Sequence, residues 1–173
     1  MRNKFGYVLC LLLVFIVGCG GPKADISIFM MGPQGIPSEV GDKLKTALET
    51  KLGPTPTIAL NTSPMFSMEK MIVEIAAGEN GIIVLPEDQF RSLAKQGGYI
   101  SLDDVANPDD FKDGIVEVTD EGKTETHLYG IHLETTKWMK DNGLNGKGLY
   151  AFIPANAKNQ ELAKQVLKSI AEK

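Results

Sequence analysis

Cysteine is confined to the start of the sequence, where Cys10 and Cys19 are the two cysteines among 173 residues. Residues 20–173 therefore contain no thiol that forms a disulfide, binds zinc or acts as a nucleophile. An excess of basic residues is also lacking, because 18 Lys and Arg stand against 22 Asp and Glu. An acidic chain with scattered lysines offers no basic stripe, so we expect no nucleic-acid partner.

Long hydrophobic runs are missing after Pro22, and the one before it is short. Arg2 and Lys4 precede YVLCLLLVFIV, which has the positive start and apolar stretch of a secretory signal peptide. About 18 uncharged residues, from 5 to 22, just reach the length at which an uncleaved transmembrane helix is the alternative. Cleavage removes Arg2 and Lys4, which takes the formal net charge from −4 to −6. We expect the remaining body to be soluble and to lie outside the membrane.

The end of the apolar run, Ile16-Val17-Gly18-Cys19, resembles the lipobox of bacterial lipoproteins. The resemblance implies cleavage before Cys19, a diacylglyceryl group on its sulfur and an acyl chain such as palmitate on its amine. Two or three chains, at roughly 0.8 kcal/mol per buried CH₂, hold a protein far more firmly than one. We predict a signal peptide over 1–18, a lipidated tether over 19–25 and one domain over 26–173, on the extracytoplasmic face of the cell membrane.

Three strand-helix units follow from residue 24 onward. Strands are predicted over 24–31, 55–60 and 81–85, and amphipathic helices over 38–53, 65–78 and 86–98. Parallel neighbours need a crossover connection, so this order predicts a mostly parallel sheet with helices on both faces. Ser38 and Ser63 stand where helix caps belong, Pro64 stands at a first helical position, and Gly53 can end the first helix.

The second half of the sequence has a different pattern. Segments 115–120 and 126–134 flank the turn residues 120–123 and predict an antiparallel hairpin. A loop-rich segment then leads to a strand over 148–154 and a last amphipathic helix over 159–173. The fold class predicted is α/β, in a single domain.

The order of these segments resembles the extracellular solute-binding proteins of bacterial transporters. The resemblance is carried by residues 68–104 (MEKMIVEIAAGENGIIVLPEDQFRSLAKQGGYISLDD), by Leu128-Tyr129-Gly130-Ile131, which is similar to the hinge strand of the family, and by residues 152–172. It implies a periplasmic-binding-protein-like lobe that binds a small solute in connection with transport or sensing.

The resemblance breaks off where the second lobe of the family would stand. About 15 residues, 135–149, separate the hinge strand from the returning strand, and a domain needs many more. The hinge proline is replaced by His132. A single lobe covers only one side of a solute, so an interaction module that docks on a membrane permease or sensor is the alternative function.

Ligands of open α/β sheets lie beyond the carboxyl ends of the strands, near helix N-termini. These positions correspond to the first-lobe ligand loops of the family, and Ser38 and Ser63 have helix capping as the plainer explanation. The predicted ligand-binding residues are Gly32, Pro33, Gln34, Gly35, Asn61, Thr62, Ser63, Glu87 and Asp88.

Metal binding and catalysis find little support in the sequence. Met65, Met68 and Met71 are thioethers of the kind that bind Cu(I), but their spacing continues into Ile72, Ile75 and Ala76 as a buried helix face. Because catalytic motifs with known spacing are also missing, we expect no metal, no cofactor and no enzyme.

The remaining polar candidates are two histidines and two acidic pairs. His127 and His132 fall on opposite faces of one predicted strand, whereas His132 and Glu134 share a face. The pairs Asp103-Asp104 and Asp109-Asp110 do not have the spacing of a calcium loop and are expected to be solvated.

Overall fold

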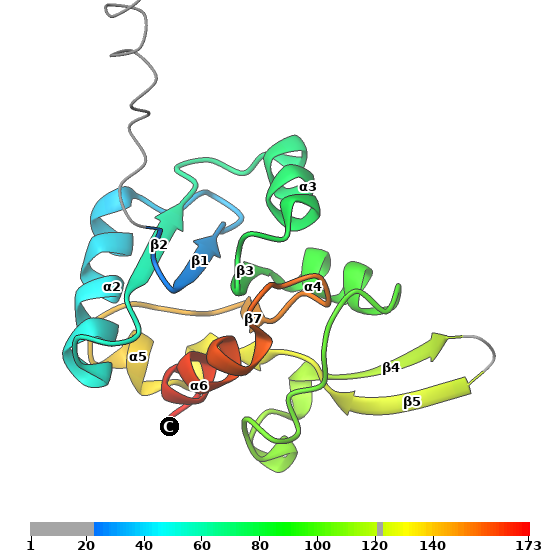
Figure 1. The fold of residues 1–173 in the computed structure, drawn as a ribbon. Coiled ribbons are helices and arrows are strands. Elements are labelled where there is room, and N and C mark those ends of the chain that lie inside the picture. Colours follow the sequence, from blue (N-terminus) through cyan, green and yellow to red (C-terminus); the bar gives the residue numbers. More distant parts are fainter. Residues whose placement is uncertain (1–22, 121–122) are drawn as a thin grey trace, which may run out of the picture.

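The computed structural model describes residues 23–120 and 123–173 (Figure 1). The predicted signal peptide, Cys19 and the turn residues Glu121 and Gly122 lie outside the described residues. In chain order the helices and strands are β1 (Ile26–Met30), α2 (Ser38–Leu52), β2 (Ile58–Thr62), α3 (Met68–Ala77), β3 (Ile82–Pro86), α4 (Glu87–Ala94), β4 (Ile115–Asp120), β5 (Lys123–Leu128), β6 (Ile131–His132), α5 (Lys137–Lys140), β7 (Leu149–Phe152) and α6 (Gln160–Ile170).

The main sheet has five strands in the order β2-β1-β3-β7-β6. β1 pairs in parallel with both β2 and β3, whereas β7 is antiparallel to its neighbours β3 and β6. Four of the five strands therefore run in one direction. The predicted mixed α/β architecture with a mostly parallel sheet is confirmed at this level.

Alternating side chains of the strands supply two separate cores. On one face, Ile28 and Val84 belong to a cluster with Leu44 of α2 and Val166 of α6. On the other face, Phe29 and Ile83 belong to a cluster with Met71 of α3 and Phe90 of α4. Helices therefore cover both faces, as the two-residue alternation of the strands requires.

The helix ends differ in part from the sequence prediction. Gly53 ends α2 with φ 84°, and its N–H donates to the Glu49 carbonyl, so that prediction is confirmed. Ser38 is the first residue of α2 and gives no side-chain cap, which corrects its predicted role. α3 begins at Met68 rather than at Pro64, because the Ser67 hydroxyl accepts the Lys70 N–H and caps the helix there.

The predicted hairpin is confirmed as β4 and β5, a separate two-stranded sheet that projects from the main body (Figure 1). Its base is tied to the body, since the Leu102 N–H donates to the Leu128 carbonyl at 2.7 Å. After β5 the chain enters the main sheet as β6, and β7 pairs beside it with His132 opposite Tyr150. The expected return of the chain to the same sheet after a short excursion is confirmed.

Candidate functional site

Two of the predicted ligand loops pack against each other. The Ile36 N–H donates to the Ser63 carbonyl at 2.6 Å, and the Gly35 N–H donates to the Gly32 carbonyl at 3.0 Å. A Cβ on Gly35, where φ is +81°, would lie 2.0 Å from the Pro64 carbonyl oxygen, so the close contact requires glycine. The backbone groups of these loops are thus largely used within the chain.

The three polar residues at the end of β2 point in different directions. Thr62 packs on α2, where its Cγ2 lies 2.7 Å from the position of a Cβ on Gly41. Ser63 is buried, and its hydroxyl donates to the Met65 carbonyl at 2.8 Å, so it is neither a helix cap nor a free ligand group. Asn61 is exposed and lines a cavity on the α3 side of the sheet.

Glu87 and Asp88 lie well away from Asn61. Glu87 opens α4, accepts a hydrogen bond from Arg91 Nε at 2.7 Å, and donates its own N–H to the Gly148 carbonyl. Asn61 lies opposite Phe29, which lies opposite Ile83. Four residues and two strand spacings separate Asn61 from Glu87, roughly 16 Å. Asn61 and Glu87 therefore do not lie side by side, and binding at the predicted loops stays a prediction.

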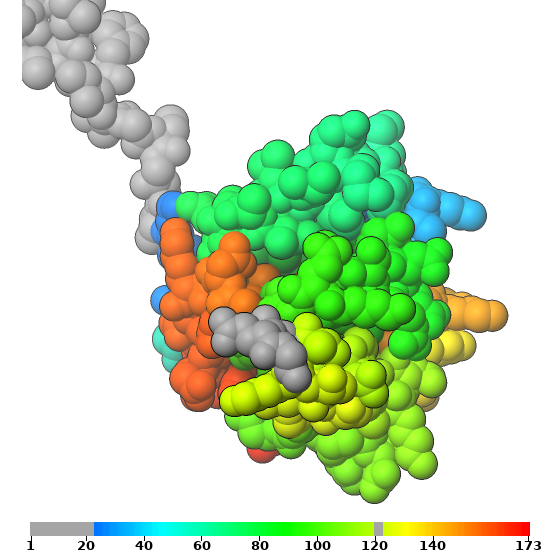
Figure 2. Space-filling model, turned by 90° about the vertical axis from the view of Figure 1, so that its right-hand side faces the viewer, coloured from blue at the N-terminus to red at the C-terminus, as the bar shows by residue number. Residues whose placement is uncertain are grey.

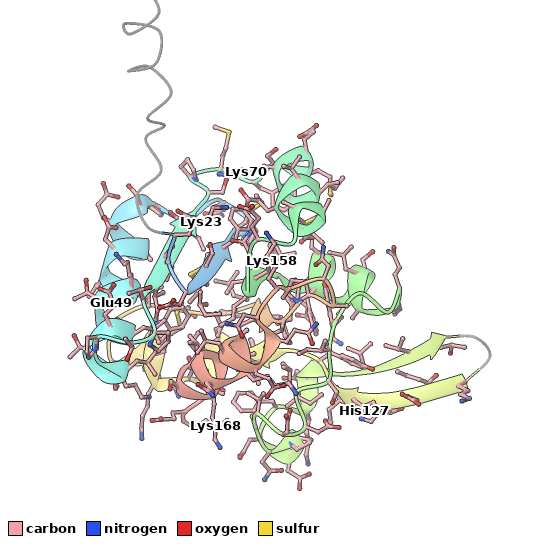
Figure 3. The ribbon with its side chains drawn as sticks, in the orientation of Figure 1. Lys23, Glu49, Lys70, His127, Lys158 and Lys168 are labelled. Carbon is pink, nitrogen blue, oxygen red and sulfur yellow. The ribbon has the colours of Figure 1, made fainter. Side chains whose placement is uncertain are left out.

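A cavity of about 420 Å³ lies between α3, the first two strands and the segment that leads into α6. We call it the α3 cavity. Ala24, Ile26, Ala59 and Ala77 supply apolar surface, and Lys23 and Lys158, labelled in Figure 3, lie at its edge. Its polar lining consists of Lys23, Asp25, Ser27, Asn61, Glu74, Glu79, Asn80, Lys158 and Asn159.

A hydrogen-bonded chain of three polar side chains underlies the α3 cavity. Ser27 Oγ donates to Asn80 Oδ1 at 2.8 Å, and Asn80 Nδ2 donates to Glu74 Oε2 at 2.8 Å. Asn80 is only 3% exposed, and Ser27 and Glu74 are half-buried. The chain fixes the orientation of the Asn80 amide, leaving the second Glu74 oxygen and the lone pairs of Ser27 as acceptors.

The local sequence explains how the Ser27-Asn80-Glu74 chain, which we call the floor of the α3 cavity, is built. Ser27 is the polar residue of β1 on the α3 side, where Phe29 and Met31 continue the core. α3 ends at Gly78 in the left-handed conformation, with φ 61°, and the next residues carry Asn80 back under the helix. The sequence prediction missed Ser27, Glu74 and Asn80. Two features of the sequence could have indicated them: a polar residue inside an apolar strand, and the Gly-Glu-Asn-Gly turn.

Charges at the rim of the α3 cavity are already paired. Glu79 lies 3.2 Å from Lys23 Nζ and 3.7 Å from Lys158 Nζ. The hydrogen bond from Lys23 and the charges of both lysines lower the pKa of Glu79 below its ordinary value. The N–H and hydroxyl of Thr57 likewise lower the pKa of Asp25. The rim therefore offers fixed charges and hydrogen-bonding groups with little net attraction for a strongly charged ligand.

A second polar cluster surrounds His132 at the other end of the sheet. The His132 ring stacks on Tyr150 with centroids 4.9 Å apart, and its Nε2 accepts the Gly148 N–H at 3.3 Å. Glu134 Oε2 lies 3.6 Å from the same nitrogen, which confirms that these two residues share a side. Tyr150 is 1% exposed, and burial raises its pKa. Because the aromatic rings are covered, this cluster stabilises the return strand and leaves little surface for a ligand.

His127 lies on a different strand from His132, which corrects the single strand expected from the sequence. Its Nδ1 lies 2.6 Å from Asp103 Oδ2, and Asp103 also accepts the Leu128 N–H at 2.8 Å. Asp104 pairs with Lys164 at 2.8 Å, and Asp110 with Lys173 at 3.4 Å. These acidic residues therefore tie segments together rather than being merely solvated. The described residues contain no group of three or more His, Cys, Asp or Glu that could hold a metal ion.

The sequence prediction placed Met65, Met68 and Met71 on one buried helix face, and the structure contradicts this. Met71 is 4% exposed, but Met68 is 46% exposed and Met65 is 68% exposed. Ile72 and Ala76, expected in the same buried face, are also exposed. The helical spacing predicts the helix correctly, but the helix buries only the side with Met71 and Ile75.

Comparison with known proteins gives one distant relative. No family model matches the chain, and no solved structure matches it. Within residues 23–120 and 123–173, no helix is long and apolar enough to span a bilayer. Over 177 aligned residues the chain is 23% identical to the protein named "Putative lipoprotein YteS" from Bacillus subtilis (strain 168), and the alignment covers 99% of each chain. This distant similarity suggests a lipoprotein attached to a membrane.

Proposed function

We propose that the protein is a lipid-anchored extracytoplasmic binding protein that takes a small, hydroxyl-rich solute into the α3 cavity. The observation that carries the proposal is the cavity itself, about 420 Å³ with a pre-organised Ser27-Asn80-Glu74 floor. Ligand pockets usually measure about 300–1,000 Å³ and combine apolar walls with a few fixed polar groups.

The anchor is supported by sequence and by similarity. The lipobox-like Ile16-Val17-Gly18-Cys19 places a lipidated cysteine four residues before the first described residue, Lys23. The distant relative is named as a lipoprotein. Its test is Cys19→Ala, which we expect to leave an uncleaved precursor that takes up no labelled palmitate. A wild-type protein without lipid label would leave the uncleaved helix as the better account.

The comparison with one lobe of a solute-binding protein is part of the proposal. The strand order β2-β1-β3 is the order of one of the two common types of doubly wound sheet, and β7 returns beside β6 after a short excursion. Such a lobe meets its solute from one side. We therefore expect weak affinity, in the millimolar range or roughly −4 kcal/mol, unless a permease or sensor supplies an opposite wall.

The ligand class follows from the lining. Two lysines and three carboxylates, Asp25, Glu74 and Glu79, give the cavity a formal charge of −1, and Glu79 is already paired with both lysines. A strongly anionic ligand gains nothing there. Hydroxyl groups both donate and accept hydrogen bonds, so they match the mixture of amide, hydroxyl and carboxylate groups. A neutral mono- or disaccharide has this chemistry.

The experiment is a titration of the full-length protein in detergent with neutral mono- and disaccharides, followed by NMR or by thermal shift. A ligand that binds the folded state raises the melting temperature by mass action. Asn61→Ala should weaken the response, because Asn61 lines the cavity and is exposed to it. Gln34→Ala is the matched control, since Gln34 is exposed in the loop that does not border the cavity.

Three outcomes are informative. Loss of binding with Asn61→Ala and not with Gln34→Ala supports the α3 cavity. The reverse result moves the site to the carboxyl ends of the strands. If no saccharide binds but a crosslinker at Gln34 captures a membrane permease or sensor, the proposed solute site is wrong and the protein is an interaction module.

A further inference from the structure

The outer side of α3 carries apolar side chains that the described chain leaves uncovered. Met68, Ile72 and Val73 are 46%, 56% and 64% exposed, and Met65 in the loop before the helix is 68% exposed. Within the described residues, these four are the exposed large hydrophobic side chains. Their clustering on one helix and its entry loop marks an interaction surface, whereas singly scattered apolar residues need no explanation. We call them the α3 outer face.

Only part of the apolar surface of α3 is buried in the core. Met71 and Ile75 point into the core with Phe29 and Phe90. Met68 and Ile72 border this buried side, and Val73 lies farther round the helix, so the three exposed residues occupy an arc that runs from the edge of the core to the opposite side. α3 therefore has an apolar surface wider than the part that the core covers, and the uncovered part faces outward. Figure 2 shows the helix along the top of the molecule, with no other described element above it.

The start of the described chain lies next to the end of this helix. Lys23 bonds Glu79, which is two residues beyond the end of α3. Cys19 precedes Lys23 by four residues, so their Cα atoms can be at most about 14 Å apart. The ten residues of α3 span about 15 Å. A lipid on Cys19 thus holds the bilayer surface near Lys23, beside the C-terminal end of the helix that carries the α3 outer face.

We infer that the α3 outer face rests in the lipid surface to which the chain is anchored, an inference that depends on the anchoring part of the proposed function. Met, Ile and Val side chains on an interfacial helix bury themselves at the boundary between headgroups and acyl chains. We favour lipid over a second copy of the chain or a protein partner as the group that covers this face. The tether keeps lipid near the face at all times, whereas a second copy or a partner must arrive by diffusion.

The charges near the face define the lipid chemistry. Lys70 is turned inward, with its Nζ 5.5 Å from the centre of the Phe29 ring. Glu69 is exposed in the first turn, and its carboxylate accepts a hydrogen bond from the Ser67 hydroxyl. Lys23 and Lys158, beyond the end of the helix, are both paired with Glu79, so they form no free basic rim of the kind that selects anionic lipids. Phosphatidylcholine is expected to suffice, with little dependence on salt.

The test uses the lipidated full-length protein in phosphatidylcholine vesicles. Because Cys10 is removed with the signal peptide and Cys19 is blocked by its lipid, the variant Ile72→Cys carries one free thiol for a fluorophore. Gln165→Cys on α6, also exposed, is the matched control site. Flotation with the vesicles reports the anchor, and quenching by lipids that carry a quencher in the upper acyl chain reports contact at the labelled position.

We expect both proteins to float and quenching to be several-fold stronger at position 72 than at position 165. Val73→Glu, combined with the label at 72, should reduce the quenching while flotation persists, and Ser92→Glu on α4 should change neither. Equal quenching at both positions in floating protein overturns the inference but leaves the anchor intact. Protein that does not float overturns both.

The other occupants give distinct results, each of which also overturns the inference. With a second copy on this face, the unlabelled Ile72→Cys variant would form a disulfide between two chains in detergent, and the labelled variant would show no lipid quenching. A protein partner would shield the fluorophore only in native membranes and not in vesicles of pure lipid.

Discussion

Replacing Asn80 by alanine tests the polar floor of the α3 cavity most directly. Asn80 is 3% exposed and connects Ser27 to Glu74 through hydrogen bonds of 2.8 Å on each side. Its Nδ2 also lies 3.4 Å from the Glu74 backbone carbonyl oxygen. Asn80→Ala removes the acceptor of the Ser27 hydroxyl and the donor to the Glu74 carboxylate, without affecting the backbone of the turn.

The magnitude follows from these contacts. A neutral hydrogen bond contributes about 1 kcal/mol and one to a charged group about 1.5–3 kcal/mol, but water in the cavity can replace part of the loss. We expect the free energy of unfolding to fall by about 2 kcal/mol. For a domain of this size that corresponds to a decrease in melting temperature of roughly 4–8 °C.

The assay is urea unfolding of the full-length protein in detergent, followed by the fluorescence of Trp138, the single tryptophan, which is buried. The double variant with Ser27→Ala should show a coupling of about 1 kcal/mol, because the two residues share one hydrogen bond. Gln34→Ala, at an exposed side chain in the loop after β1, should change stability by less than about 0.5 kcal/mol. Suppose that Asn80→Ala changes the free energy of unfolding as little as that control does, and that its effect and the effect of Ser27→Ala are additive. The Ser27-Asn80-Glu74 floor is then not a coupled network.

Three further predictions concern the fold. Gly130→Ala should destabilise by about 1–3 kcal/mol in urea unfolding, because its Cβ would lie 2.5 Å from Phe90 Cζ, whereas Gly98→Ala, with 3.8 Å to the nearest atom, should be mild. Ser67→Ala should lower the melting temperature through loss of about 1 kcal/mol of capping, and Ser38→Ala should not, because Ser38 makes no side-chain cap. Burial opposes ionisation of Asp103, but the Leu128 N–H and His127 outweigh it and lower its pKa below 3.8. Its contribution to stability is therefore complete above about pH 4 and lost as pH falls through the lower folded pKa, so Asp103→Asn should flatten the acid side of the melting curve against pH.

The arrangement of helices and strands was accessible from the sequence because local patterns determine it. The apolar run from Ile26 to Met30 and the spacing of Leu44 and Leu48 each have one arrangement that buries their side chains. The return of residues 148–153 to the sheet region of 128–133 was expected from the order of the segments and from the few residues between them, but the place of β7 between β3 and β6 was not predicted.

Two parts of the structure were not accessible in this way. Periodicity shows that α3 is a helix, but it does not show that the fold covers only the Met71 side and leaves Ile72 exposed. The α3 cavity is likewise made by tertiary contact, since Ser27 and Asn80 are 53 residues apart in the chain. The sequence prediction placed the ligand at the carboxyl ends of the strands, and this remains a prediction; in the structure, two of these loops are joined by a backbone hydrogen bond.

The short excursion between β6 and β7 has a practical consequence. Because His132 lies directly opposite Tyr150, the chain leaves and re-enters the sheet at points about 5 Å apart. Gly143 lies on the surface of that excursion, and a Cβ there would meet no atom within 4 Å. A compact reporter domain with adjacent termini, inserted after Gly143, would not need to pull the two strands apart. The excursion is therefore a suitable place for an internal fluorescent fusion that leaves both the lipid-bearing end and the α3 cavity undisturbed.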